Sequence, residues 1–313
     1  MKILATNLTI DAKKLLKASD IEVIDTEITQ NELINFIENQ YIEGIIFDKL
    51  EDFNSDLIDT CTSIKLIAFK DNIEENSDIQ YAKDQGIHIV SVSNATSVAK
   101  AELTFAHLLG MVRFLHQSNR EMPLEGDINF DVLHNNFMGT EVKDKTIGII
   151  GMNNTGIEIA KIAIGLGMKP LMTDHQPKNV LVPIEFYDGQ TIEFHIEYSD
   201  FNDVLSKSDF LIINTKSDNS FILDEHHFEQ LKNGVGIVNL EQGAINEITL
   251  LNAIEHKKVT FAGLDAFEHQ PTPEIQLLMN PELSLSPNVG SKTYEAQLKI
   301  SNELANAIVN ILE

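Results

Sequence analysis

The most informative stretch of the chain is KTIGIIGMNNTGIEIAKIAIGLG, residues 145–167. A short β-branched run is followed at once by a helical pattern, and Gly151 and Gly156 bound the turn between them. This order is typical of dinucleotide-binding folds, in which the phosphates lie against the N-terminus of the helix. Asp174 ends the next strand-like run, where an acid accepts hydrogen bonds from an adenosine ribose. The stretch therefore predicts a nucleotide site or the remnant of one.

Asn153 stands in the middle of this turn, at a position where dinucleotide-binding folds have a glycine. That glycine lets the backbone approach the pyrophosphate, so an asparagine side chain fills part of the space. Asparagine tolerates a positive φ better than most residues, and its amide can donate a hydrogen bond to phosphate. We therefore expect weakened cofactor binding, with Asn153 and its neighbour Asn154 among the residues that line the cofactor site.

Strand-like and helical patterns alternate along the chain, which predicts an α/β fold with two parallel sheets, each flanked by helices. The strand-like runs are KILAT, GIIFD, IKLIAFK and HIVSVS, followed by KTIGIIG, KPLMTD, DFLIINT, GVGIVNL and FAGLDA. Apolar spacing predicts one long helix over residues 97–122, joining two domains, and another over 291–313. Asp188 and Gly189 separate two alternating runs, which predicts a β-hairpin over residues 183–198.

Composition narrows the class of protein. The length of 313 residues fits two domains of ordinary size. A formal net charge of −25 disfavours nucleic acid and anionic membranes as partners, and it opposes anionic substrates. The sequence has neither a membrane-spanning apolar run nor the pattern of a secretory signal, so we expect a cytoplasmic protein. The single cysteine, Cys61, excludes an internal disulfide and is expected to be a buried structural thiol.

The chain resembles the D-isomer-specific 2-hydroxyacid dehydrogenases, and within them most closely the short-form D-3-phosphoglycerate dehydrogenases. The resemblance is carried by AELTFAHLLGMVRFLHQSNREMPLEG, GTEVKDKTIGIIG, GVGIVNLEQGAINE, FAGLDAFEHQPTP and LSPNVGSKTYEAQ. It implies two Rossmann-like domains: a flavodoxin-like substrate domain, residues 1–98 and 288–313, around an NAD-binding Rossmann domain, residues 99–287. It also implies NAD as the cofactor, a small-molecule ligand and a homodimer, with a heteromer containing an active relative as an alternative.

The same resemblance implies where the catalytic residues should stand. The family uses an arginine to hold the substrate carboxylate, a histidine to exchange the hydroxyl proton and a glutamate to tune that histidine. This chain has Gln242 at the arginine position, Gln270 at the glutamate position and Asn288 at the histidine position. A neutral amide cannot offer a cationic fork, titrate near neutral pH or raise the pKa of a neighbour. We therefore expect severely impaired catalysis.

The family's glycine-rich anion cradle, which includes an arginine, is also missing from this chain. Phe69 stands at the arginine position, and the residues after it are charged or bulky. Asp71, Glu74 and Glu75 would repel phosphoglycerate, and Lys70 is expected to be a solvated surface charge. The resemblance therefore implies a substrate loop that no longer binds an anion.

Three further residues leave alternatives open. The family counterpart of Asp265 contacts the nicotinamide carboxamide, but Asp265 is equally suited to cap the end of a strand. Lys100 in AKAEL and Lys216 in NTKS stand near the expected cofactor, where either lysine could replace the lost positive charge. The sequence does not choose between these roles.

Two functional hypotheses follow. The favoured one is a catalytically impaired, NAD-binding paralogue that acts as a sensor, a scaffold or a partner subunit. The alternative is a working NAD-dependent oxidoreductase that acts on a 2-hydroxy or 2-oxo acid or an uncharged relative, with a relocated acid such as Lys100 or His269. His269 is better explained as an exposed loop residue, and His226 and His227 as surface or capping residues without a metal site.

Overall fold

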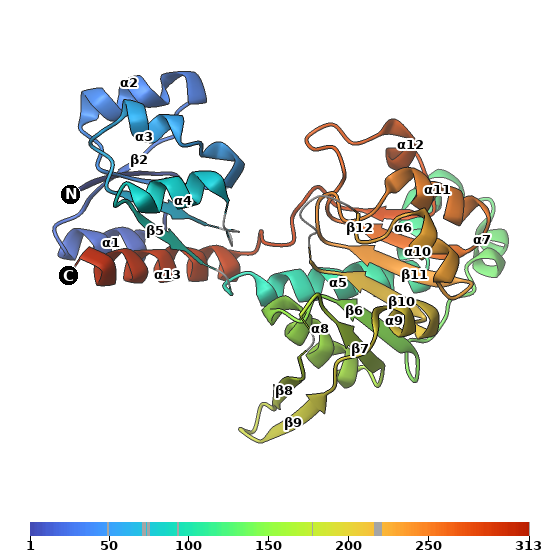
Figure 1. Ribbon diagram of the computed structural model, residues 1–313. Helices are drawn as coiled ribbons and strands as arrows, with labels where there is room; N and C mark the ends of the chain where they lie inside the picture. The colour runs from blue at the N-terminus through green and yellow to red at the C-terminus, as the bar shows by residue number, and fades with distance from the viewer. Residues whose placement is uncertain are drawn as a thin grey trace. The chain divides into compact units, whose positions relative to one another are not determined.

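The structure is a computed structural model that describes residues 1–48, 50–70, 73, 76–92, 94–176, 178–215 and 221–312. They form two compact units (Figure 1). Unit 1 comprises Met1–Thr96 and Lys292–Glu313, and unit 2 comprises Ser97–Ser291, so the expected NAD-binding domain lies within unit 2. Each unit holds a parallel sheet flanked by helices, which confirms the predicted fold class.

Unit 1 is built on a five-stranded parallel sheet in the order β2-β1-β3-β4-β5. Its elements are β1 (Lys2–Ala5), α1 (Ile10–Ala18), β2 (Glu22–Asp25), α2 (Gln30–Gln40), β3 (Gly44–Phe47), η1 (Leu50–Asp52), α3 (Asp56–Thr60), β4 (Leu66–Phe69), α4 (Ser77–Asp84), β5 (His88–Ser91) and α13 (Tyr294–Leu312). Two apolar cores lie on opposite faces, one beneath α1 and α13 and the other beneath α2, α3 and α4. The second core includes Cys61, which is 2% exposed, as predicted for a structural thiol.

Unit 2 is built on a six-stranded sheet in the order β13-β12-β11-β10-β6-β7, with all strands parallel. Its elements are α5 (Ser97–Val112), α6 (Leu115–Glu125), α7 (Phe130–Asn136), β6 (Thr146–Ile150), α8 (Asn154–Gly165), β7 (Lys169–Thr173), β8 (Val180–Glu185), β9 (Thr191–Ile196), α9 (Phe201–Lys207), β10 (Phe210–Ile213), α10 (Glu225–Gln230), β11 (Val235–Asn239), α11 (Glu247–Glu255), β12 (Val259–Leu264), α12 (Ile275–Leu278) and β13 (Leu283–Leu285). One core holds residues of α5 and α8, and the other holds residues of α9, α10 and α11.

The strand order of unit 2 locates the place where a ligand would bind. From β6 the chain moves outward to β7, and it then returns to β10 on the other side of β6. Such a reversal opens a crevice at the carboxyl ends of the strands, where open α/β sheets bind their ligands. The loops after β6 and β10 therefore lie at the expected centre of a nucleotide site.

The expected long helix over residues 97–122 is wrong in one respect, because it is two helices. Helix α5 ends at Val112 and α6 begins at Leu115. Phe114, between them, has a left-handed backbone with φ of 54°, which interrupts the helical hydrogen bonds. Its ring packs against Phe137 and Phe261, each at 5.7 Å between ring centroids. Contacts with residues distant in the sequence therefore accompany a break that apolar spacing alone does not predict.

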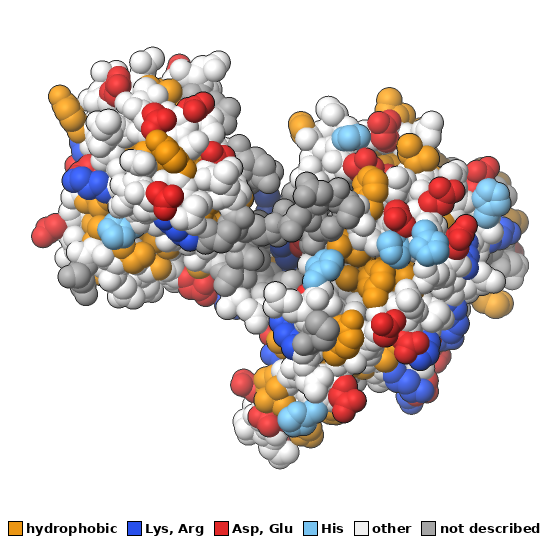
Figure 2. Space-filling model, in the orientation of Figure 1, with side chains coloured by type: hydrophobic (Ala, Val, Ile, Leu, Met, Phe, Trp, Pro, Cys, Tyr) orange, Lys and Arg blue, Asp and Glu red, His pale blue; other side chains and the backbone are white. Residues whose placement is uncertain are grey.

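The predicted hairpin is present as β8 and β9, paired antiparallel, with Gly189 at φ of 85° in the turn. Partners across the two strands share a face, and one face is entirely apolar: Val180, Val182, Ile184, Ile192, Phe194 and Ile196. Val180 and Val182 are buried in the core of unit 2, whereas Ile192 and Phe194 are 49% and 37% exposed. The apolar face of the hairpin thus extends beyond the core. Figure 2 shows that the hairpin as a whole also carries acidic and histidine side chains.

The core of unit 1 provides a test of the division into units. Phe69 is fully buried and its ring lies 5.8 Å from that of Phe47 and 6.0 Å from that of Phe53. We expect Phe69→Ala to cost roughly 3–5 kcal/mol of the stability of unit 1. Hydrogen exchange should accelerate in β3 and β4 and stay unchanged in β10 and β11. Phe228→Ala, in the core of unit 2, should give the opposite pattern, and acceleration of both units by either variant would contradict the division.

Candidate nucleotide and catalytic site

The turn between β6 and α8 can only be built with glycines. Gly151 has φ of +116°, and a Cβ added there would lie 2.7 Å from the carbonyl oxygen of Asn214. A Cβ on Gly156 would lie 2.1 Å from the carbonyl oxygen of Gly151. Both distances are too short for any side chain, so the two glycines are required for the close approach of helix and strand. The turn therefore has the geometry that the sequence predicted at these two positions.

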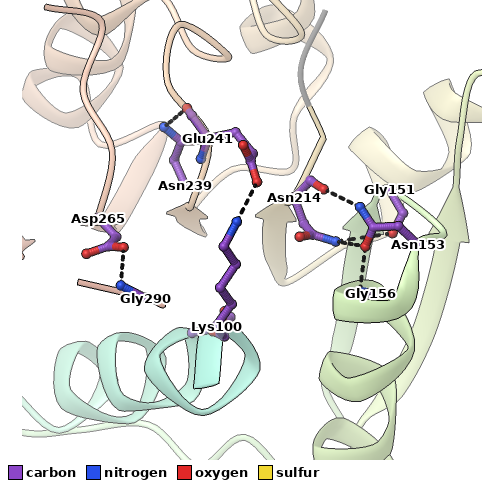
Figure 3. A network of polar contacts seen from close by, with 10 residues as sticks. Lys100, Gly151, Asn153, Gly156, Asn214, Asn239, Glu241, Asp265 and Gly290 are labelled. Carbon is purple, nitrogen blue, oxygen red and sulfur yellow. Dashed lines mark hydrogen bonds and ion pairs between the residues drawn. The ribbon is translucent and has the colours of Figure 1, made fainter. Parts of the chain in front are cut away.

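Asn153 is the N-cap of α8, and its side chain bridges the loops after β6 and β10 (Figure 3). Its Oδ1 accepts hydrogen bonds from the backbone N–H of Gly156 at 3.0 Å and from Nδ2 of Asn214 at 2.7 Å. Its Nδ2 donates to the carbonyl oxygen of Asn214 at 2.9 Å. The backbone of Asn153 is extended, with φ of −87°, so the positive φ that asparagine tolerates is not used. Asn154, the first residue of α8, is exposed.

The arrangement of Asn153 changes what the helix N-terminus offers. If residue 153 were a glycine, the backbone N–H of Gly156 would remain available to an anion. Here the Asn153 side chain already accepts from that N–H, and its own amide donates to Asn214. A phosphate would therefore compete with an internal acceptor at the N-terminus of α8.

Asp174 follows β7 and braces the same turn. Its Oδ2 accepts a hydrogen bond from the backbone N–H of Met152 at 2.7 Å, and the residue is half-buried. This places a carboxylate beside the glycine turn at the end of the strand next to β6, where a ribose-binding acid is expected. The contact with a ribose stays a prediction.

The loop after β11 holds a residue that the sequence analysis did not single out. Glu241 Oε1 lies 3.6 Å from Nζ of Lys100, which projects from α5 (Figure 3). The expectation that Lys100 replaces a lost positive charge is therefore incomplete, because an acid neutralises it. The available signal was the acid in NLEQG, directly before Gln242. Gln242 itself is exposed.

Gln270 and Asn288, at the two remaining positions where the resemblance implies catalytic residues, lie within hydrogen-bonding distance of each other. Asn288 Nδ2 donates a hydrogen bond to Oε1 of Gln270 at 3.2 Å. The backbone N–H of Asn288 donates to the carbonyl oxygen of Asp265 at 2.8 Å, and Asn288 has φ of +53°. Two of the three amides, Gln270 and Asn288, are thus brought together, and no hydrogen bond joins either of them to Gln242 among the described residues.

The family model for the D-isomer-specific 2-hydroxyacid dehydrogenase NAD-binding domain matches residues 105–290. The chain belongs to this dehydrogenase family. Hydroxypyruvate reductase of Thermotoga maritima is 29% identical over 298 residues, 94% of this chain and 92% of that protein. D-3-phosphoglycerate dehydrogenase of Archaeoglobus fulgidus is 29% identical over 318 residues, 99% of this chain but 57% of that protein. An acyclic imino acid reductase solved with NADPH and D-Arg has a TM-score of 0.82 at 22% identity, covering 100% of this chain and 97% of that one.

The family resemblance implies that Asp265 contacts nicotinamide. In the structure, its carboxylate accepts hydrogen bonds from residues 286–290. Its Oδ1 accepts from Ser286 Oγ at 2.5 Å and from the N–H of Val289 at 2.9 Å. Its Oδ2 accepts from the N–H of Gly290 at 2.8 Å, and the residue is 2% exposed. These contacts are those of a cap that ties the end of β12 to the loop after β13. The nicotinamide contact stays a prediction.

Behind Asp265 lies a buried polar chain that the sequence analysis also missed. The two ring nitrogens of His107 lie 2.8 Å from Ser284 Oγ and 2.8 Å from Ser286 Oγ. Because Ser286 donates to Asp265, its oxygen is left to accept from Nε2–H of His107, and Nδ1 then accepts from Ser284. Burial lowers the pKa of His107 below its ordinary value, although Asp265 opposes the shift. Burial thus favours the neutral form of the imidazole, which lies between the two serines.

The other candidate acids and bases make contacts of their own in unit 2. The side chain of His269 is 62% exposed and lies 3.9 Å from Glu268, which agrees with an exposed loop residue. His227 completes a capping box with Asp224 at the start of α10, in line with its expected capping role. Burial raises the pKa of Glu247, whose Oε1 accepts from the N–H of Glu268 at 2.7 Å. Glu247 therefore holds the loop that leads to Gln270.

The expectation for Lys70 in unit 1 is wrong. Its side chain is only 11% exposed and is paired with Asp48, and its Nζ donates to the carbonyl oxygen of Thr6 at 2.6 Å. A lysine at the end of a parallel strand meets the carboxyl ends of the neighbouring strands, which sequence position alone does not reveal. Four other expected positions, Asp71, Glu74, Glu75 and Lys216, lie outside the described residues.

The neutral state of His107 predicts a pH dependence of stability. The unfolded chain takes up a proton near the ordinary pKa of 6.5, whereas the folded chain does so only at lower pH. The free energy of unfolding should therefore fall as the pH drops below about 6.5, by up to about 1.4 kcal/mol per pH unit. When the free energy of unfolding is measured by urea denaturation at a series of pH values, its decrease with falling pH should be shallower for His107→Gln than for the wild type.

Part of the slope should remain in that variant, because burial and Arg120 also lower the pKa of His116. His195→Gln, at an exposed hairpin position, is the matched control and should keep the full slope. An unchanged slope in His107→Gln would show that the pKa of His107 does not differ between the folded and unfolded chain.

Proposed function

We propose that this chain binds a nicotinamide dinucleotide weakly at the carboxyl edge of the unit 2 sheet and does not exchange hydride with 2-hydroxy or 2-oxo acids. It would then act as a sensor, a scaffold or a partner subunit of an active relative. The observation that carries the proposal is the hydrogen bond between Asn288 and Gln270. Two amides occupy the positions at which the family resemblance implies a histidine and a glutamate.

The chemistry of this pair supports loss of carbonyl reduction. A bound reduced dinucleotide would supply a hydride, and the carbonyl oxygen that accepts the electron pair then needs a proton. Asn288 can donate a hydrogen bond to that oxygen but cannot give up the proton, because a carboxamide does not titrate in the physiological range. Gln270 accepts from Asn288 without charge, so it cannot raise a partner's pKa. General acid–base catalysis alone contributes about 10²- to 10⁴-fold.

Without an arginine at position 242, the chain also lacks the group that the resemblance implies for binding the substrate carboxylate. A planar guanidinium binds a carboxylate through two parallel hydrogen bonds, and a glutamine offers only a neutral amide. Gln242 is exposed and follows Glu241, so the nearest charge along the chain is negative. The substrates implied by the family resemblance are anions, and the site around Gln242 no longer favours them.

Dinucleotide binding is supported by the glycine turn and limited by Asn153. Gly151 and Gly156 allow the tight turn and bring the N-terminus of α8 close to the end of β6, and Asp174 stands beside that turn. Hydrogen bonds of Asn153 to Gly156 and Asn214 must be exchanged for bonds to the ligand. NAD and NADP both remain candidates, because one structural relative was solved with NADPH.

The role of Asn153 is testable by fluorescence and calorimetric titration of NADH, which the absence of tryptophan favours. Asn153→Gly removes the internal acceptor and frees the N–H of Gly156, so the affinity for NADH should rise roughly tenfold. The helix should lose only a few tenths of a kcal/mol, because glycine is a tolerated N-cap. Asn76→Gly removes the N-cap side chain of α4 in unit 1, so it is the matched control and should leave the affinity close to that of the wild type. Equal affinity of wild type and Asn153→Gly would show that Asn153 does not weaken the binding of NADH.

Loss of activity is testable with a panel of 2-oxo acids, including phosphohydroxypyruvate, and with both NADH and NADPH. Purified protein should show no turnover. The triple variant Gln242→Arg, Gln270→Glu and Asn288→His should also fail with phosphohydroxypyruvate, since the sequence of residues 70–75 still contains three acids. Appreciable turnover of this substrate by the triple variant would overturn the account of the substrate loop. Turnover by the wild type, abolished by Lys100→Met or His269→Asn, would instead establish the alternative of a relocated acid.

A further inference from the structure

A partly buried ion pair joins α5 to the loop after β11. Lys100 projects from α5 towards Glu241 in the loop after β11, with 3.6 Å between Nζ and Oε1 (Figure 3). The side chains are 23% and 14% exposed. Water therefore screens the two charges less than it would on an open surface, while each side chain keeps part of its surface exposed to solvent.

The pair is held in place by its surroundings. Asn239, 3% exposed, donates from Nδ2 to the carbonyl oxygen of Glu241 at 2.9 Å and accepts from its backbone N–H at 3.2 Å. On the other side, a Cβ added to Gly290 would lie 3.3 Å from Cγ of Lys100, so the lysine stem runs close to that glycine. Gly290 is fixed in turn by Asp265. The pair thus behaves as a positioned dipole, because its attachment points are fixed on both sides.

A positioned dipole discriminates between ligands by their charge pattern. A monoanion such as a 2-oxo acid is attracted by Lys100 and repelled by Glu241, so the two contributions oppose each other. A zwitterion that carries a carboxylate and an ammonium group on one carbon can lie antiparallel to the pair. Its carboxylate then meets Lys100 and its ammonium group meets Glu241, while the internal ion pair stays intact. All four neighbouring contacts join opposite charges.

The rest of the molecule adds to this preference. The net charge of −25 opposes the approach of an anion but not of a zwitterion, whose net charge is zero. The nearby amides Gln242, Gln270 and Asn288 add no charge to the same sheet edge. Gln270 Nε2 is buried and has no hydrogen-bond acceptor among the described residues, so it remains a donor without a partner.

We infer that Lys100 and Glu241 form a binding site for the carboxylate and ammonium groups of a free α-amino acid. The site goes beyond the proposed dinucleotide binding, because neither residue needs the cofactor to present its charge. It also explains why an acid is tolerated directly before the position at which the family resemblance implies an arginine. The chain would bind the amino acid while remaining unable to reduce a 2-oxo acid.

The inference is tested by calorimetry and thermal shift in the absence of NADH. The probes are the common α-amino acids in both configurations, with pyruvate, lactate, propionate and ethylamine as analogues of alanine that lack one of its two charges. At least one amino acid should bind saturably and raise the melting temperature. Its 2-oxo analogue should bind roughly tenfold more weakly or not at all.

Charge removal separates the two contacts. Glu241→Gln should weaken binding of the amino acid roughly tenfold or more and strengthen binding of its 2-oxo analogue, because only Lys100 remains charged. Lys100→Met should abolish binding of both. The control is the exposed pair Lys207–Asp203 on α9, where Lys207→Met and Asp203→Asn should change neither binding nor preference.

Failure to fold is separated from failure to bind by a second variant. Lys100→Met combined with Glu241→Gln removes both charges of the pair, so it should stay folded by circular dichroism and bind no amino acid. Absence of binding by every amino acid in the wild type would overturn the inference, as would undiminished binding by the folded double variant. A separate NADH titration of the same samples reports on the dinucleotide site, so either site can fail without obscuring the other.

Discussion

The close approach of Gly156 to the carbonyl oxygen of Gly151 governs the geometry of unit 2. A helix that begins this near a strand end can exist only if neither position carries a side chain, since even a Cβ would lie 2.1 Å from the oxygen. This contact sets the start of α8, and with it the turn that places Asn153 against the loop after β10. Asp174, Glu241 and Asp265 belong to the same edge of the unit 2 sheet, because its parallel strands end there together.

Along that edge the chain satisfies internally several polar groups that a ligand would otherwise engage, although Gln270 Nε2 remains without an acceptor among the described residues. Asn153 accepts from the helix N-terminus, Asp265 accepts from the loop after β13, and Asn288 donates to Gln270. Each bond removes the cost of an unpaired polar group, which favours the folded chain in the absence of a ligand. The same bonds lower the gain available from binding, because a ligand must replace them. The internal hydrogen bonds that stabilise the fold along this edge therefore oppose affinity for a cofactor.

Sequence reasoning succeeded where the cause of a structure is local. Gly151 and Gly156 are forced by backbone geometry, and Asp188-Gly189 gives the hairpin, so both features are visible in a few adjacent residues. It failed where distant residues decide. The break at Phe114 coincides with ring contacts to Phe137 and Phe261, and the pairing of Lys100 depends on Glu241 in another loop. The burial of Lys70 similarly depends on the ends of other strands.

Helix α13 has a consequence for how the protein is made. It packs against α1 in unit 1, yet the whole of unit 2 lies between them in the sequence. During synthesis, unit 2 leaves the ribosome with all its strands before α13 exists, whereas one face of the unit 1 sheet still lacks part of its cover. Apolar residues of β1, β4 and β5 stay exposed for that interval, during which a nascent chain is vulnerable to aggregation. The unit that begins first is thus completed last.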